Sequence, residues 1–225
     1  MSILSKSLER IKPSPTISVT QKARELKAKG EDIISLGSGE PDFDTPDNVK
    51  SAAIEAIKNG QTKYTAVDGT VDLKNAIVSK FKKENNLTYE KNQISVGAGG
   101  KQVIYNAFLA TINSGDEIII PSPFWVSYPD IVLLAGGIPK IIECGEEDNF
   151  KLTAKSLKKN ITQKTKWLII NSPGNPTGSC YSEQEINELV DVLVKYPKIL
   201  IMSDDIYEHI IYDEFNFYTP AQNNK

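Results

Sequence analysis

The feature that most constrains the fold is an alternation of short apolar runs with helical stretches, which begins after Asn92. Strands are expected at 93–97, 116–120, 138–143, 165–171 and 198–203, and helices at about 100–112, 125–135, 153–160 and 183–195. β-branched runs separated by helices are typical of a parallel sheet covered on both faces. The sequence therefore predicts an α/β fold with a mostly parallel sheet flanked by helices.

The residues before this alternation have a more helical pattern. Helices are expected at 17–29, at 46–60 and at 71–84, because apolar side chains recur there at helical spacing. Thr45 is a candidate N-cap and Pro46 a candidate first-turn residue of the second helix. A short strand is expected at 33–36, and the two prolines at 13 and 15 are expected to form a hinge after an N-terminal arm.

Composition and charge exclude several classes of protein. The net charge of −3 offers no global positive field for nucleic acid, and the apolar runs are too short to span a bilayer. The charged first dozen residues do not resemble a signal peptide, so the cytoplasm is the expected location. Two cysteines and one histidine, His209, do not suit a disulfide framework, a zinc site or a Ser-His-Asp hydrolase, and no metal site is predicted.

A glycine-rich turn could bind a phosphate. Gly97-Ala98-Gly99-Gly100 follows an expected strand and begins a helix, so backbone N–H groups and the helix dipole would converge on an anion. A Walker loop is excluded, because it would require Gly at 95 and Ser or Thr at 102. A dinucleotide site would also require Gly at 102. A tight turn without a ligand remains the simpler alternative.

Three other strand ends carry candidate side chains. Asn175 lies in the proline-containing segment 171–178, Asp204 and Tyr207 follow the last strand, and Trp125 lies just beyond the strand at 116–120. In parallel sheets, ligands bind outside the carboxyl ends of the strands. Each residue also has a simpler interpretation, as a turn residue, a surface acid or a core aromatic. A buried carboxylate would need a partner, and a cationic ring nitrogen would serve.

The order of these motifs resembles the pyridoxal phosphate-dependent aminotransferases of the aspartate aminotransferase family, and most of all their bacterial aspartate-type subgroup. The motifs that carry the resemblance are SLGSGEPDFDTP at 35–46, KYTAVDGTVDLK at 63–74, GAGGKQ at 97–102, PFWVSYP at 123–129, NSPGNPTG at 171–178 and SDDIYEH at 203–209. They extend over essentially the whole chain.

The resemblance implies roles for the residues that bind the cofactor, pyridoxal 5′-phosphate. Gly99, Gly100 and Lys101 match the residues that bind its phosphate, mainly through backbone N–H groups. Trp125 matches the aromatic side chain that stacks on its pyridine ring. Asn175 matches the side chain that hydrogen-bonds both its phenolic oxygen and a carboxylate of the substrate.

The resemblance also implies a catalytic pair and a second subunit. Asp204 matches the carboxylate that pairs with the pyridine nitrogen, and Tyr207 matches the phenol that shares the phenolic oxygen. Gly39 matches a backbone position beside the substrate carboxylate. Tyr64 matches the tyrosine that reaches the cofactor phosphate of a neighbouring subunit, so a homodimer is expected.

Two family residues have no match within 1–225. The lysine that forms the Schiff base with the cofactor follows the strand-end Asp by some tens of residues in the family, and the arginine that binds the substrate α-carboxylate belongs to the C-terminal part of the family's chains. We therefore expect residues 1–45 to form an arm and a small-domain segment, and 46–225 an incomplete cofactor-binding large domain. Lys101 is a less suitable substitute for the lysine, because it is expected beside the phosphate. The 225-residue chain alone is expected to be inactive.

The function implied by the resemblance is transfer of an amino group from an amino acid, aspartate or glutamate, to a 2-oxo acid. Two alternatives remain open. One is a related enzyme with the same cofactor, such as an aromatic or prephenate aminotransferase or a carbon-sulfur lyase. The other is an aminotransferase-like binding domain without turnover. His209 is expected to be structural.

Overall fold

The computed structural model describes residues 3–37 and 39–223. These residues form two compact units. The sheet unit comprises the described residues up to Ile11 together with those from Asp68 onward, and the helical unit comprises Lys12–Val67. The domain boundary expected near residue 45 stays a prediction.

The helical unit contains α1 (Pro15–Ala28) and α2 (Asp47–Lys58). Both helices were expected, but α2 begins one residue later than predicted. Pro46 is its N-cap, with no side-chain capping bond, so the capping role predicted for Thr45 is wrong. The strand expected at 33–36 is also wrong: this segment is irregular, and none of the described strands pairs with it. An isolated strand leaves its backbone groups without partners, which explains why an apolar run alone did not suffice.

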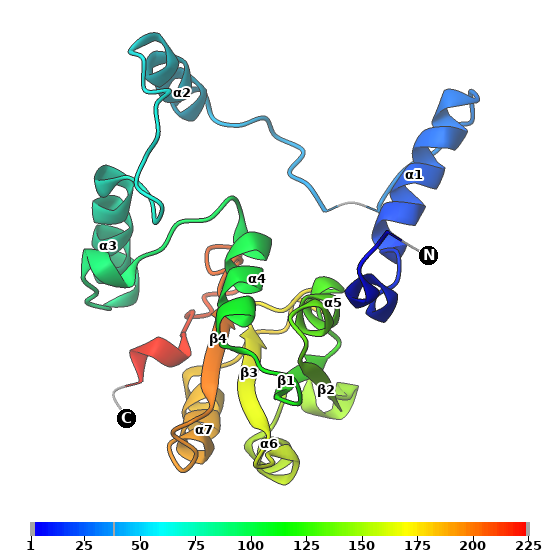
Figure 1. Ribbon diagram of the computed structural model, residues 1–225, viewed down its shortest axis with the longest axis vertical. Helices are drawn as coiled ribbons and strands as arrows, with labels where there is room; N and C mark the ends of the chain where they lie inside the picture. Colours follow the sequence, from blue (N-terminus) through cyan, green and yellow to red (C-terminus); the bar gives the residue numbers. More distant parts are fainter. Residues whose placement is uncertain (1–2, 38, 224–225) are drawn as a thin grey trace. The chain divides into compact units, whose positions relative to one another are not determined.

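The sheet unit is built on four parallel strands in the order β2-β1-β3-β4. The strands are β1 (Glu117–Ser122), β2 (Ile138–Glu143), β3 (Thr165–Asn171) and β4 (Leu200–Asp204). Figure 1 shows them side by side. The predicted parallel α/β fold is confirmed. The strand expected at 93–97 is wrong, because Val96 pairs with the loop residue Asp68 instead of a sheet strand.

Helices cover both faces of this sheet, as Figure 1 shows. One face packs against α4 (Gly100–Thr111) and α5 (Ser127–Leu134), and the other against α6 (Ala154–Asn160) and α7 (Glu183–Leu193). Successive strand side chains point to opposite faces, so β1 contributes to both cores. Ile118 and Ile120 lie in the core beneath α4 and α5, and Ile119 lies in the other.

The remaining elements surround this core. They are α3 (Val71–Asn85) and the short 3-10 helices η1 (Lys6–Arg10), η2 (Lys91–Gln93), η3 (Glu146–Asp148) and η4 (Pro220–Gln222). Thr70 caps α3 by accepting a hydrogen bond from the Leu73 N–H. Arg10 of η1 donates to the carbonyl of Leu133 at the end of α5 (3.3 Å). Among the described helices, none is both long and apolar enough to cross a membrane.

Candidate active site

One cavity of about 310 Å³ opens at the carboxyl ends of the strands. It lies where the chain order in the sheet reverses, with β1 leading to β2 on one side and β3 leading to β4 on the other. This reversal is where parallel sheets bind ligands. The structure brings all seven sequence-predicted site residues of the sheet unit to this cavity. Its lining consists of Gly99, Gly100, Lys101, Ile104, Trp125, Tyr128, Asn171, Asn175, Asp204, Ile206 and Tyr207.

The N-terminus of α4 forms one wall of the cavity. Gly99 precedes the helix with φ of +89°, a conformation that favours glycine, and a Cβ built there would meet nothing within 4 Å. Among the described residues, the N–H groups of Gly100 and Lys101 have no acceptor. Two free donors at the positive end of a helix dipole, in front of open space, suit a phosphate.

Trp125 supplies an aromatic surface to the same cavity. It lies between β1 and α5, and it packs edge-to-face with the neighbouring Tyr128 ring, with centroids 5.3 Å apart. The ammonium of Lys101 lies 5.0 Å from the centre of the indole ring. The cavity thus combines a flat aromatic side chain with a cation, which suits a ligand that is both planar and anionic.

Asp204 ends β4 and is held by a partner that the sequence analysis did not identify. The Tyr128 hydroxyl donates to Asp204 Oδ2 at 2.6 Å, and the Tyr128 side chain is buried. Burial, together with the adjacent Asp204 carboxylate, raises the pKa of Tyr128 far above its usual value. The hydroxyl therefore stays protonated and donates to the carboxylate, which fixes the orientation of one carboxylate oxygen.

Asn171 connects the ends of two strands to the asparagine turn. Its side-chain amide donates to the Asp204 carbonyl (2.8 Å), and its side-chain oxygen accepts from the Asn175 N–H (2.8 Å). One side chain at the end of β3 therefore fixes both the end of β4 and the backbone that carries Asn175.

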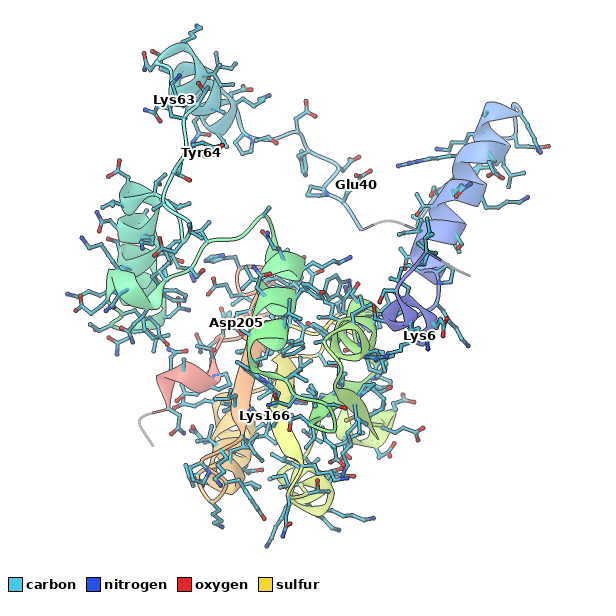
Figure 2. All side chains as sticks on the ribbon, in the orientation of Figure 1. Lys6, Glu40, Lys63, Tyr64, Lys166 and Asp205 are labelled. Carbon is cyan, nitrogen blue, oxygen red and sulfur yellow. The ribbon has the colours of Figure 1, made fainter. Side chains whose placement is uncertain are left out.

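Two predicted site residues, Gly39 and Tyr64, belong to the helical unit. Tyr64 follows α2, and its side chain is fully exposed, as Figure 2 shows. The roles expected for these two residues stay predictions.

The sequence analysis missed four residues that line the cavity: Ile104, Tyr128, Asn171 and Ile206. Tyr128 was available as a signal, because a tyrosine on a helix rich in apolar residues needs a partner for its hydroxyl when it is buried. Asn171 was also visible as a polar residue at the end of the most apolar strand. Their common partner Asp204, however, lies 76 residues from Tyr128 and 33 residues from Asn171, so spacing alone could not pair them with it.

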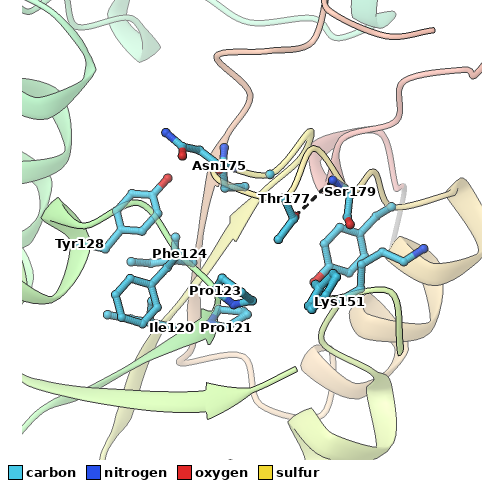
Figure 3. A pocket seen from close by; sticks show the side chains of 14 residues that line it. Ile120, Pro121, Pro123, Phe124, Tyr128, Lys151, Asn175, Thr177 and Ser179 are labelled. Atoms are coloured by element: carbon cyan, nitrogen blue, oxygen red, sulfur yellow. Dashed lines mark hydrogen bonds between the residues drawn. The ribbon is translucent and has the colours of Figure 1, made fainter. Parts of the chain in front are cut away.

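A second cavity, of about 30 Å³, adjoins the first (Figure 3). Tyr128, Asn171 and Asn175 line both cavities, and Lys151 and Thr177 lie on the far side of the smaller one. A space of this size admits a water molecule but no organic ligand. We therefore consider the larger cavity the candidate ligand site.

Comparison with known proteins identifies the family. Residues 31–223 match the family model of the class I and II aminotransferases, a family that is generally pyridoxal phosphate-dependent. The chain is 60% identical to a probable aspartate/prephenate aminotransferase of Rickettsia felis, covering 99% of this chain and 54% of that protein. It is 59% identical to the aspartate/prephenate aminotransferase of Cereibacter sphaeroides, covering 99% of this chain and 56% of that protein.

Solved structures agree with this match. The aspartate aminotransferase of Rhizobium meliloti has a TM-score of 0.94 at 46% identity, covering 99% of this chain and 56% of that one. The aspartate aminotransferase of Thermus thermophilus, solved with maleate, has a TM-score of 0.94 at 40% identity. The match covers 99% of this chain and 58% of that one. The chain thus spans about half the length of the relatives it matches.

Proposed function

Because the chain belongs to the class I and II aminotransferase family, we propose that it forms the cofactor-binding part of a pyridoxal phosphate-dependent aminotransferase. The proposed reaction moves an amino group from aspartate or glutamate to a 2-oxo acid. The observation that supports it best is that Gly99, Gly100, Lys101, Trp125, Asn175, Asp204 and Tyr207 line a single cavity.

The cavity fits the cofactor at three separate places. The unpartnered N–H groups of Gly100 and Lys101 suit its phosphate. The indole of Trp125 suits its flat ring. The carboxylate of Asp204, oriented by Tyr128, suits a protonated pyridine nitrogen. A site for a neutral or purely apolar ligand would need none of these three features.

The residues of the chain have distinct tasks in this proposal. Bound pyridoxal phosphate supplies an electron sink for the carbanion that forms when the substrate loses its α-proton. Asp204 holds a proton at the ring nitrogen and thereby keeps the ring electron-withdrawing. Asn175 and Tyr207 donate hydrogen bonds to the phenolic oxygen, and Asn175 also contacts a substrate carboxylate. Asn171 keeps Asn175 in place.

The substrates and the assembly are proposed on the same basis. The names of the relatives point to aspartate and prephenate, and maleate, the ligand in the Thermus structure, is a dicarboxylate. Lys101 offers the cavity a cation suited to acidic ligands. We propose a cytoplasmic homodimer in which Tyr64 contacts the partner's cofactor phosphate and Gly39 lies beside the substrate carboxylate.

The proposed function predicts a half-reaction that absorbance can follow. The complete gene product, loaded with pyridoxal phosphate, is expected to convert to the pyridoxamine form when aspartate or glutamate is added. Addition of a 2-oxo acid should restore the starting spectrum, and prephenate should be tested as a second acceptor. A loaded protein whose spectrum does not change with any amino donor would contradict the aminotransferase and would favour a binding domain without turnover.

Tyr128 is expected to act as a positioning residue for Asp204. Tyr128→Phe removes the hydroxyl but keeps the ring, so kcat should fall by about tenfold, as is usual for a hydrogen bond to a charged group. Tyr105→Phe is the matched control, because the Tyr105 hydroxyl makes no hydrogen bond to the described residues. The measurement is kcat together with the dissociation constant of the cofactor. Equal values for both variants would show that the Tyr128 hydroxyl has no such role.

A further inference from the structure

The turn at 205–208 carries Tyr207 into the candidate active site. It directly follows β4 and is closed by a hydrogen bond from the Glu208 N–H to the Asp205 carbonyl (3.0 Å). The two central residues, Ile206 and Tyr207, both line the larger cavity. A shift of this turn would therefore move the Tyr207 side chain relative to Asp204.

The start of the turn is anchored to the sheet unit by Asp205. The Ser203 hydroxyl donates to Asp205 Oδ1 (2.6 Å), and the same hydroxyl lies 3.3 Å from the hydroxyl of the buried Thr219. Burial raises the pKa of Asp205, although the hydrogen bonds from Ser203 and Thr219 act in the opposite direction. The position of the first turn residue is thus fixed by β4 and by the segment before η4.

The end of the turn is anchored to α3 by Glu208. Its carboxylate accepts hydrogen bonds from Lys80 Nζ and from Asn85 Nδ2, the second at 2.9 Å. Lys80 also donates to Asn85 Oδ1 (2.8 Å), so each of the three side chains contacts the other two. Asn85 is buried, and the Glu208 side chain is only 15% exposed.

The environment of Glu208 keeps it ionised. Partial burial acts to raise its pKa, but the hydrogen bonds from Lys80 and Asn85 outweigh this effect and hold the pKa below its usual value. Charged hydrogen bonds shielded from water hold their geometry better than exposed ion pairs do. The hydrogen bonds between α3 and the turn should therefore hold Glu208 in a fixed position.

Two further titratable side chains, Glu84 and His209, lie beside this contact. Glu84 lies 3.7 Å from Lys80, and His209 Nε2 lies 3.0 Å from Glu84 Oε2. Both side chains are more exposed than Glu208, so solvent weakens their contribution. The Lys80 ammonium already contacts both carboxylates, and we therefore interpret the cluster as an ion-pair network that carries its own cation.

We propose that Lys80, Asn85 and Glu208 form a clasp that positions Tyr207 in the active site, an inference that rests on the proposed function. None of the three lines the cavity among the described residues, so they act through the turn and are positioning residues. The clasp joins α3 to the residue directly after Tyr207. Of these two neighbouring residues, Tyr207 lines the cavity, and Glu208 holds the turn against α3.

A double-mutant cycle on the complete gene product tests the clasp. Glu208→Gln keeps the size of the side chain but removes its charge, and it is expected to lower kcat by about tenfold in the unmodified protein. In a Tyr207→Phe background the same change should lower kcat by less than about twofold, because the hydroxyl that the clasp positions is already absent. Lys80→Met should behave like Glu208→Gln, and Lys80→Arg should retain most of the activity.

The control is Lys83→Met, which alters an exposed lysine of the same helix and should leave kcat unchanged. Losses of equal size in both backgrounds would show that the three residues only stabilise the fold, and would overturn the proposal.

Hydrogen exchange of the cofactor-free protein gives a second readout. Glu208→Gln should speed exchange of the 206–210 amides, while β3 amides stay protected; unchanged exchange at 206–210 would also overturn it. An unmodified protein without transamination would instead refute the proposed function.

Discussion

Asp204→Asn is expected to lower kcat by roughly 10²–10³-fold, as is typical when one preorganised electrostatic partner of a reacting group is removed. The substitution keeps the size of the side chain and removes its negative charge. Without that charge, the ring nitrogen of the proposed cofactor loses its proton, and the ring becomes a weaker electron sink. Tyr128 can still donate to the amide oxygen, so the fold of the strand end should persist.

The test measures kcat and the affinity for pyridoxal phosphate in the complete gene product. Asp213→Asn is the matched control: it makes the same chemical change at an exposed residue outside the cavity and should have no effect. An Asp204→Asn protein that kept more than about a tenth of the original kcat would refute the assigned role.

The second large effect concerns the helix whose N-terminus faces the cavity. Phe108 anchors α4 to the sheet: its side chain is fully buried, and its ring centre lies 5.5 Å from that of Trp167 on β3. Phe108→Ala should lower the free energy of unfolding by about 3–5 kcal/mol, because the lost apolar contact leaves a cavity behind. Chemical denaturation of the complete gene product measures this change.

The neighbouring residue provides the control for this prediction. Leu109 lies on the same helix but is 56% exposed, so Leu109→Ala should change the free energy of unfolding by less than about 0.5 kcal/mol. Similar effects of the two substitutions would mean that α4 does not pack on the sheet through Phe108.

The sheet could be predicted from the sequence because its strands combine strong apolar runs with helices between them. The expected bounds of β2 and β3 coincide with those in the structure. The segments 33–36 and 93–97 also contain β-branched apolar residues, yet neither forms a strand. A run of apolar residues indicates that a segment is buried, but a strand also requires an adjacent strand whose backbone groups pair with its own in a hydrogen-bond ladder. That second condition depends on tertiary structure.

In the candidate site, too, some features could be predicted from the sequence and others depend on tertiary structure. Asp204, Asn175 and Trp125 could be predicted because strand ends in a parallel sheet meet at one edge, and the family resemblance supplied their roles. The contacts of Tyr128 and Asn171 with Asp204, and those of the clasp with Glu208, could not be predicted, since these partners are at least 33 residues away in the sequence. Lys80 and Glu208, for example, are 128 residues apart. Some of the side chains that hold the site together can be noticed in the sequence, but their long-range pairing is visible only in the structure.

The most direct test of the account is a crystal structure of the complete gene product with pyridoxal phosphate. We expect the phosphate at the N–H groups of Gly100 and Lys101, the ring against the indole of Trp125, and the ring nitrogen within hydrogen-bond distance of the Asp204 carboxylate. A cofactor bound elsewhere, or an Asp204 carboxylate turned away from the ring nitrogen, would contradict the claim that these strand ends form the cofactor site.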